Sequence, residues 1–349
     1  MTADKVVGQK APMVASIPPP PPPAGRYLVT GAGGFVGSHL VRRLAAAGCE
    51  VVAADLAPPS NLPPGVDFVR CDLRDRVSVR RAVESSRATR AVHLAAKVGD
   101  WGPAEDFEAL NVTGTEWVLE SLTDAGFEHA IHVSSIVVFG QDAGPMATEG
   151  APIVTDGPPY TATKARGELV ARRFQAQGAP VTVVRPGDVY GVGSVPWVVR
   201  PIELLRKRQM ILVDGGRGHF AHLHVANLVD GFMRVFATPA AKGEAFVLTD
   251  GDHHMTMGEY FGRLADAVGL TPPKVSLPRV AARALAGAIE AGARLTGTTP
   301  PFTRAAIDYV LRAGSFDTRK ARDVLRWTPR VTVEEGLREI GRHYGRLVT

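Results

Sequence analysis

The sequence of 349 residues predicts an α/β fold, a doubly wound parallel sheet with helices on both faces and a smaller C-terminal lobe. Apolar runs of strand length alternate with helical patterns between residues 26 and 186. A glycine-rich turn joins the first run to the first helical pattern. Beyond Pro186 the alternation loosens, so this half is expected to lie over the carboxyl edge of the sheet, where such folds bind ligands.

Residues 1–25 precede the first strand, include six consecutive prolines and show no apolar periodicity. This composition is typical of a disordered or polyproline leader. The first α/β unit is therefore expected to span residues 26–186, and the smaller lobe residues 187–349. Part of the segment 219–236 is expected to pack back onto the first unit.

The elements of the first unit follow one another in strand–helix order. Strands are short apolar runs, and helices repeat apolar residues at a period near 3.6. The strands are expected at 26–30, 50–55, 66–72, 91–96, 130–135 and 181–186, and the helices at 35–48, 77–86, 104–126 and from Tyr160 onward. In the lobe, the sequence predicts helices at 197–208, 226–236, 257–268 and 279–296.

The segment YLVTGAGGFVGSHL places Gly31, Gly34 and Gly37 between the first strand and the first helix. The backbone there must turn tightly, approach a pyrophosphate without a Cβ in the way, and aim a helix N-terminus at its charge. Phe35 and Val36 lie inside this motif and are expected to contact the same ligand. The motif in this context predicts a dinucleotide site of the Rossmann type.

Acidic strand ends indicate which dinucleotide binds. Asp55 closes the second strand 18 positions after Gly37 (55 − 37), where a carboxylate accepts hydrogen bonds from a free ribose and repels a 2′-phosphate. No Arg follows within the next several residues, so NAD(H) is favoured over NADP(H). Further contacts are expected with the adenine, from Asp72 and Leu73, and with the pyrophosphate, from Leu94, Ala95 and Ala96.

The glycine motif, HVSSIVVFG and YTATK together resemble the extended short-chain dehydrogenase/reductases of the NAD-dependent epimerase/dehydratase superfamily. The resemblance covers residues 26–349 and is closest in pattern to 3β-hydroxysteroid dehydrogenase-like members. It implies Ser135, Tyr160 and Lys164 as the catalytic set, with a separation of 25 between serine and tyrosine (160 − 135). It also implies NAD contacts from Asn111, Tyr160, Lys164 and Pro186.

The chemistry of hydride transfer explains these residue types. A hydride leaves a carbinol carbon only if the hydroxyl proton also departs, so a base must lie within hydrogen-bond reach. Free tyrosine, with a pKa of about 10, is a poor base at neutral pH. Lys164 follows Tyr160 by one helical turn, and its ammonium is expected to lower the phenol pKa and to hold the nicotinamide ribose. Ser135 is expected to hydrogen-bond the substrate oxygen.

The C-terminal half distinguishes between reactions. Sugar-nucleotide members of the family carry Asn at the position of Asp188, and Arg-Asp at the positions of Phe220 and Ala221. Losing a cation and gaining a carboxylate disfavours a diphosphate, although Arg217 is near enough in sequence to compensate. The sequence therefore favours an oxidoreductase for an apolar secondary alcohol or ketone, either sterol-like or a lipidic β-hydroxy compound. A nucleotide-sugar 4-epimerase or dehydratase and a non-catalytic dinucleotide-binding regulator stay open as alternatives.

No metal site is expected. Only His222 and His224 share a face of a strand, and no regular Cys or carboxylate spacing completes a site with the histidines of HFAHLH and DHH, which are His219, His222, His224, His253 and His254. Cys49 and Cys71 fall inside elements predicted to be buried, which suits a reducing compartment better than a disulfide framework.

The net charge of +5 originates in residues 279–349, which hold 13 Lys and Arg against 7 Asp and Glu. These arginines are not interleaved with aromatic residues, so nucleic acid is not an expected partner. No apolar run reaches membrane-spanning length and no signal peptide is evident, so a cytoplasmic protein is expected. Helix 279–296 is a candidate for weak peripheral membrane contact. The family resemblance implies a homodimer through helices 104–124 and 159–177.

Overall fold

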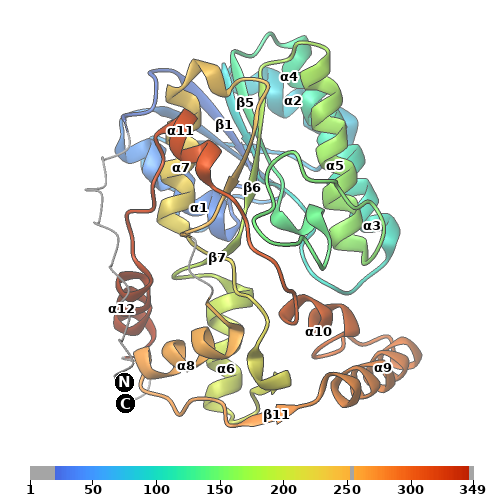
Figure 1. Cartoon of the computed structure of the whole chain (residues 1–349). Coiled ribbons are helices and arrows are strands. Elements are labelled where there is room, and N and C mark those ends of the chain that lie inside the picture. Colours follow the sequence, from blue (N-terminus) through green and yellow to red (C-terminus); the bar gives the residue numbers. More distant parts are fainter. Residues whose placement is uncertain (1–19, 252–254, 346–349) are drawn as a thin grey trace, which may run out of the picture.

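A computed structural model describes residues 20–251 and 255–345 of the chain. Its centre is a parallel seven-stranded sheet in the order β10-β6-β5-β4-β1-β2-β3, with helices on both faces (Figure 1). The predicted doubly wound α/β fold is confirmed. The strands are β1 (Arg26–Thr30), β2 (Glu50–Asp55), β3 (Asp67–Arg70), β4 (Arg90–His93), β5 (His129–Val133), β6 (Val181–Pro186) and β10 (Ala245–Leu248).

Two helical layers enclose the sheet. One face packs against α1 (Phe35–Ala46), α7 (Val225–Ala237) and α11 (Arg319–Leu325), and the other against α2 (Arg76–Ser86), α4 (Gly114–Asp124) and α5 (Pro159–Ala176). A short helix, α3 (Ala104–Glu108), continues through a π-helical turn, η1 (Ala109–Thr113), into α4. The predicted helix over 104–126 is thus one helical segment whose middle turn is wider than an α-helix.

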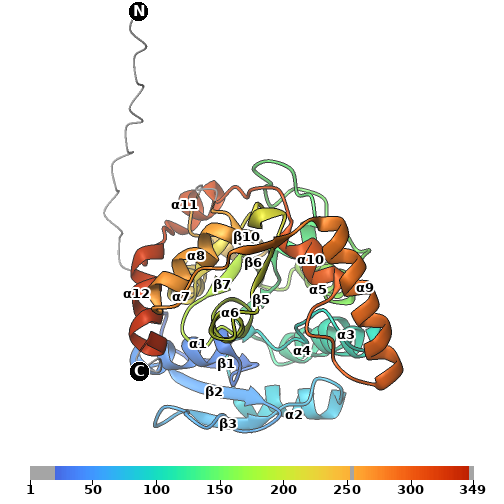
Figure 2. The same ribbon diagram turned by 90° about the horizontal axis from the view of Figure 1, so that it is seen from below.

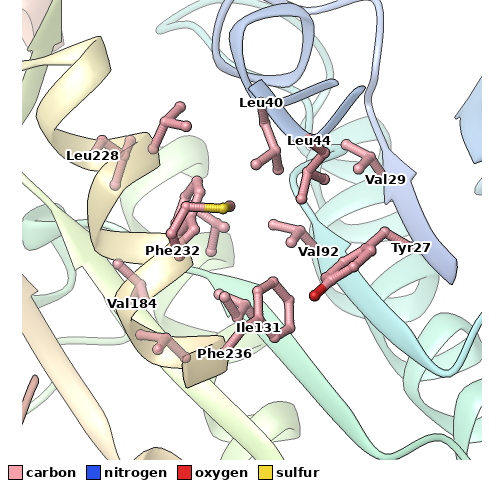
Figure 3. Packing of buried hydrophobic residues seen from close by; sticks show 14 of the residues in the cluster. Tyr27, Val29, Leu40, Leu44, Val92, Ile131, Val184, Leu228, Phe232 and Phe236 are labelled. Atoms are coloured by element: carbon pink, nitrogen blue, oxygen red, sulfur yellow. The ribbon is translucent and has the colours of Figure 1, made fainter. Parts of the chain in front are cut away.

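The strands are apolar on both faces because both faces are covered. Figure 3 shows one of the two resulting cores, where Tyr27 and Val92 of the sheet meet Leu40 of α1 and Phe232 of α7. These side chains are at most 2% exposed. Trp327, which follows α11, belongs to the same core and donates from its indole nitrogen to the carbonyl of Asn227 at 3.0 Å.

The sheet takes its last strand from the second half of the chain. β10 pairs in parallel with β6, with Phe246 opposite Val184. α7 and α11 also come from beyond residue 187 and cover the sheet beside α1. The predicted segment 26–186 therefore holds six of the seven strands. The seventh strand, β10, and the helices α7 and α11 come from the predicted lobe, residues 187–349.

The lobe lies beyond the carboxyl ends of the strands, as Figures 1 and 2 show. Its core contains Tyr190, Phe220, Tyr260, Leu264 and Ile340. Among the described residues, no helix is both long and apolar enough to cross a bilayer. The helices of the lobe are η3 (Val195–Val199), α6 (Arg200–Arg206), α8 (Met257–Ala267), α9 (Arg279–Thr296), α10 (Arg304–Val310) and α12 (Val333–Tyr344), and its strand pairs are β7 (Asp188–Tyr190) with β9 (His222–His224) and β8 (Ile211–Val213) with β11 (Val275–Leu277).

Candidate active site

The turn between β1 and α1 consists largely of glycine because its backbone lies against other backbone. Gly31 has a φ of +68°, and a Cβ at this residue would lie 2.8 Å from the Cα of Ala95. A Cβ on Gly37 would lie 2.1 Å from the carbonyl oxygen of Gly31. Neither position accepts a side chain without movement of the backbone, so these glycines hold the start of α1 close to the end of β1.

The N-terminus of α1 faces a cavity of about 1540 Å³ lined by both the sheet and the lobe. Gly34 is the N-cap and offers no side-chain cap, and the first turn of the helix contains no acidic residue. The first N–H groups and the helix dipole are therefore available to an anionic group such as a pyrophosphate. Phe35 and Val36 line the cavity beside this helix end.

Asp55 lies in the wall of the same cavity, at the end of β2. Its Oδ2 accepts from the N–H of Gly33 at 2.9 Å, and its Oδ1 accepts from the N–H of Leu56 at 2.8 Å. These bonds fix the carboxylate and leave further lone pairs for a ribose diol. The arrangement fits the adenosine half of NAD(H) and disfavours a 2′-phosphate.

Most other residues predicted to bind the cofactor also line the cavity. Asp72 does so, but Arg74 holds its carboxylate at 3.1 Å and thereby lowers the pKa of Asp72. The Asp72 side chain is thus engaged within its own turn. The remaining cavity-lining residues of the predicted set are Gly31, Gly34, Gly37, Leu73, Leu94, Ala95, Ala96, Tyr160, Lys164 and Pro186.

Asn111 does not line the cavity. It is buried in the π-helical turn η1, where its Oδ1 accepts from the N–H of Lys97 at 2.7 Å. Its Nδ2 donates to the carbonyl of Lys97 and to the hydroxyl of Thr163, both at 3.0 Å. A Cβ on Gly167 would lie 2.3 Å from the carbonyl oxygen of Asn111, so η1 packs closely on α5. Asn111 therefore helps to position α5, and its predicted contact with the cofactor stays a prediction.

The three predicted catalytic residues come together in the cavity wall. Tyr160 and Lys164 lie in the first turns of α5, which begins at Pro159. Ser135 follows β5 and hydrogen-bonds to Tyr160. The adjacent Ser134 instead donates to Glu168 at 2.7 Å. Of the two neighbouring serines, it is therefore Ser135 that faces the tyrosine.

Burial shifts the pKa values of both Tyr160 and Lys164. It raises the pKa of Tyr160 to about 12, although the hydrogen bond with Ser135 acts in the opposite direction. It lowers the pKa of Lys164 to about 8, and the Lys164 Nζ donates to the carbonyl of Val133 at 2.6 Å. In this structure Ser135, and not Lys164, is the group that acts to lower the phenol pKa, so the predicted effect of the ammonium on Tyr160 stays a prediction. At neutral pH, Tyr160 is a neutral phenol and Lys164 is mostly a cation.

A buried ion pair lies one helical turn beyond Lys164. Arg185 of β6 and Glu168 of α5 are both fully buried, with 2.5 Å between Nη2 and Oε1. Burial acts to raise the pKa of Glu168, but the hydrogen bonds and charge of Arg185 overcome it and lower the pKa. Glu168 therefore stays ionised and ties α5 to the sheet one helical turn beyond Lys164.

The lobe side of the cavity is mainly apolar. Arg200 is the only Lys or Arg of the described lobe residues that lines it, and Arg217 does not. Phe220 stands where sugar-nucleotide members carry Arg. It is fully buried and stacks on Tyr260, with ring centroids 4.0 Å apart, so this position provides an aromatic ring instead of a cation. The apolar side chains that line this side include Trp197, Leu204, Met210, Leu285, Phe302 and Ile307.

Asp188 contributes no net charge to the cavity. Arg312 forms an ion pair with its carboxylate, which also accepts from the hydroxyl of Tyr309 at 2.5 Å. The N–H of Ala221 donates to the same carboxylate at 2.9 Å. The sequence argument that this carboxylate repels a diphosphate therefore does not hold, because its charge is neutralised. Arg312 and Tyr309 were not predicted, since they are more than 120 residues away in sequence and belong to no motif.

The described histidines form no common site. Among the described residues, no three His, Cys, Asp or Glu side chains gather as metal ligands. His219 bonds to the carbonyl of Gly314, and His224 accepts from the N–H of Ala226 at the start of α7. Cys71 is buried, Cys49 is half-buried and both are free thiols. His253 and His254 lie outside the described residues.

Comparisons with known proteins match most of this chain. The model of the NAD dependent epimerase/dehydratase family matches residues 27–249. The 2-alkyl-3-oxoalkanoate reductase of Stenotrophomonas maltophilia is 29% identical over 334 residues, covering 90% of this chain and 98% of the reductase. The 3β-hydroxysteroid-dehydrogenase/decarboxylase isoform 2 of Arabidopsis thaliana is 27% identical over 343 residues, covering 89% of this chain and 60% of that protein.

A solved structure extends the likeness to the whole fold. MoeE5 in complex with UDP-glucose and NAD superimposes with a TM-score of 0.74 at 26% identity, covering 93% of this chain and 100% of MoeE5. The likeness therefore includes both the parallel sheet and the lobe. The predicted resemblance to NAD-dependent relatives, including a 3β-hydroxysteroid dehydrogenase, is confirmed.

Proposed function

Because this chain belongs to the NAD-dependent epimerase/dehydratase family, we propose that it interconverts an apolar secondary alcohol and its ketone. The substrate class is a sterol-like molecule or a lipidic β-hydroxy compound. The observation that carries this proposal is the apolar lobe side of the cavity, in which Arg200 is the only lining cation among the described lobe residues. Apolar walls bind such a substrate through buried area, at about 25 cal/mol per Å².

The residues present fit NAD. The uncapped start of α1 suits the pyrophosphate, Asp55 suits the adenosine ribose, and Lys164 suits the nicotinamide ribose. When bound, NAD⁺ would accept a hydride from the alcohol carbon, and NADH would supply one to the ketone carbon. The protein supplies the position of the reacting oxygen and the path of its proton.

Tyr160 and Ser135 serve the reacting oxygen. The Ser135 hydroxyl hydrogen-bonds that oxygen, and the Tyr160 hydroxyl gives it a proton during ketone reduction. Giving up this proton leaves Tyr160 as a phenolate, which regains a proton from solvent. Alcohol oxidation runs the other way, so Tyr160 first loses its phenol proton to solvent and the phenolate oxygen then takes the proton of the alcohol O–H. Because the pKa of Tyr160 is raised to about 12, neutral pH favours the proton-donating form that ketone reduction needs.

Relatives support the apolar substrate. The Stenotrophomonas maltophilia reductase is named for a 2-alkyl-3-oxoalkanoate and the Arabidopsis thaliana enzyme for a 3β-hydroxysteroid. Both names describe a ketone or alcohol on an apolar skeleton, which is the chemistry that the cavity walls suit.

A second candidate is a nucleotide-sugar epimerase or dehydratase. MoeE5 was solved with UDP-glucose, and Arg200 lines the cavity of this chain where it is available to a diphosphate. A diphosphate held by Arg200 alone would depend on that one charge-assisted contact. This candidate therefore predicts that Arg200→Ala raises the KM for a nucleotide sugar by about tenfold or more.

A competition assay tests the proposal. The purified chain with NAD is given hydroxysteroids and long-chain β-hydroxy compounds in one set, and UDP- and dTDP-sugars in the other. Turnover of an apolar alcohol, equally fast in the Arg200→Ala variant, is the expected result. Turnover of a nucleotide sugar that depends on Arg200, with no activity on any apolar alcohol, would replace the proposal with the second candidate.

A further inference from the structure

Helix α9 turns its larger apolar side chains toward solvent. Val280 and Leu295 are 80% and 89% exposed, and Leu285 is 45% exposed. The buried side of the helix consists of Ala282, Ala286, Glu290 and Ala293. A surface helix ordinarily has the opposite arrangement, with apolar residues inward and polar residues outward.

The polar groups of α9 are engaged with the rest of the protein. Arg283 forms an ion pair with Asp308 of α10. Glu290 accepts from the side chain of Arg304, with 2.8 Å between Oε2 and Nη2. These contacts fix the rotation of the helix, so its apolar face points outward in a defined orientation. The outward face of α9 carries no carboxylate, because Glu290 is the only acidic residue of the helix and lies on its buried side.

The apolar face continues into the substrate side of the cavity. β11 leads directly into α9 and pairs with β8, so that exposed Val275 lies opposite exposed Ile211. Ile211 and Leu285 also line the cavity. β11 and α9 lie at the edge of the lobe that is farthest from the sheet (Figure 1). We call the exposed apolar residues Ile211, Val275, Val280, Leu285 and Leu295 the apolar rim.

Positive charges flank the apolar rim. Lys207 and Arg208 follow α6 and precede Ile211 by a few residues, and Lys274 immediately precedes Val275. All three are exposed, and none forms an ion pair within the described part of the chain. A second copy of the chain pairing through this surface in a two-fold manner would bring these cations near their equivalents, whereas an anionic surface would neutralise them.

We propose that the apolar rim docks on a bilayer surface that contains anionic phospholipid. Its apolar side chains enter the interface between headgroups and acyl chains, while Lys207, Arg208 and Lys274 meet the phosphates. Ile211 and Leu285 then connect the bilayer to the cavity, so an apolar substrate reaches Tyr160 without crossing water. This route for the substrate rests on the proposed function, but the docking itself does not.

Vesicle sedimentation tests the docking without any substrate. The full chain with NAD is sedimented with vesicles of phosphatidylcholine alone, or of equal parts phosphatidylcholine and phosphatidylglycerol. Binding only to the anionic vesicles is expected, weakening as salt is raised. Val280→Glu is expected to weaken binding about tenfold, because it places a carboxylate on the docking face. Val77→Glu on α2 is the matched control, since Val77 is 64% exposed and lies on the parallel-sheet part of the molecule, away from the apolar rim. This variant is expected to change vesicle binding less than twofold.

Two further measurements separate the possible outcomes. Lys207→Gln/Lys274→Gln is expected to reduce binding and its salt dependence, because both cations then no longer meet lipid phosphates. Equal binding by wild type and Val280→Glu, or no binding to anionic vesicles, overturns the docking proposal. Sedimentation velocity without lipid identifies the alternative, a dimer that Val280→Glu dissociates, and this result also overturns it. Turnover of an apolar alcohol by a chain that binds no vesicles removes the docking proposal while the proposed function stands.

Discussion

In the proposed reaction, the hydroxyl group of Tyr160 exchanges a proton with the substrate oxygen. Tyr160 also lines the cavity, and Phe in its place would keep the ring and remove only the hydroxyl. Tyr160→Phe is therefore expected to lower turnover by at least about 100-fold, with NAD affinity changed less than twofold. Steady-state rates and an NAD titration of the same preparation measure both. A variant that keeps most of its rate would show that another group moves the proton.

The buried lysine gives the reaction a predictable pH dependence. Because burial lowers the pKa of Lys164 to about 8, its ammonium is present below that pH and lost above it. Tyr160, with a pKa of about 12, stays protonated throughout. The kcat/KM for ketone reduction is thus expected to be level up to about pH 7 and to fall as pH rises through about 8. A profile that stays level to pH 10 would contradict the role of the Lys164 charge.

The carboxylate of Asp55 is expected to decide between the two dinucleotides. Fixed by the N–H groups of Gly33 and Leu56, it accepts from a ribose diol and repels a 2′-phosphate. NAD(H) is therefore expected to bind more tightly than NADP(H), and Asp55→Asn to narrow that difference about tenfold. Titrations of wild type and variant with both dinucleotides check this. Equal affinities in the wild type would exclude the assignment.

At the scale of single residues, the sequence predicts the position of a side chain correctly when a local motif determines its surroundings. The glycine turn and the first turns of α5 are such motifs, and their residues line one cavity. Asn111 could not be placed from sequence, because its partners Lys97 and Thr163 are set by packing of η1 on α5. The neutralised charge of Asp188 is likewise not visible in the sequence, since Arg312 reaches its carboxylate from the C-terminal segment.

At the scale of elements, α5 depends on the buried pair of Glu168 and Arg185. Glu168→Ala would leave the guanidinium of Arg185 buried without its partner, and is expected to lower the free energy of unfolding by about 3–5 kcal/mol. The control is Glu116→Ala on α4, whose carboxylate pairs with Arg173 at an exposed position, with an expected loss below about 1 kcal/mol. Denaturant unfolding measures both. Equal losses would show that the buried pair does not anchor α5.

Strand and helix positions follow from sequence where one period persists over a whole element. β1, β2 and β6 begin and end at the predicted residues. The segment over 104–126 differs because its periodicity continues through the π-helical turn η1, which side-chain pattern alone does not reveal. The sequence does not place β10 in the sheet, because a short apolar run carries no information about its partner strand.

At the scale of the molecule, the cavity lies where two parts of the fold meet. The sheet side contains the glycine turn and the proposed reacting residues, and the lobe side is mainly apolar. The family and the cofactor were predictable because their motifs are local and lie in the first half of the chain. The shape of the substrate side was not, because it depends on η3, α6, β8 and α10 meeting in space.

The proposed function and an epimerase differ in whether the substrate is oxidised overall. An epimerase returns the hydride from the nicotinamide to its product, so no reduced nicotinamide accumulates. The most direct measurement incubates the chain with NAD⁺ and an apolar secondary alcohol, and follows reduced nicotinamide and ketone together. The account predicts that both accumulate in equal amounts and that Tyr160→Phe abolishes both. Conversion of a nucleotide sugar with no accumulation of reduced nicotinamide, and no reaction of any apolar alcohol, would contradict it.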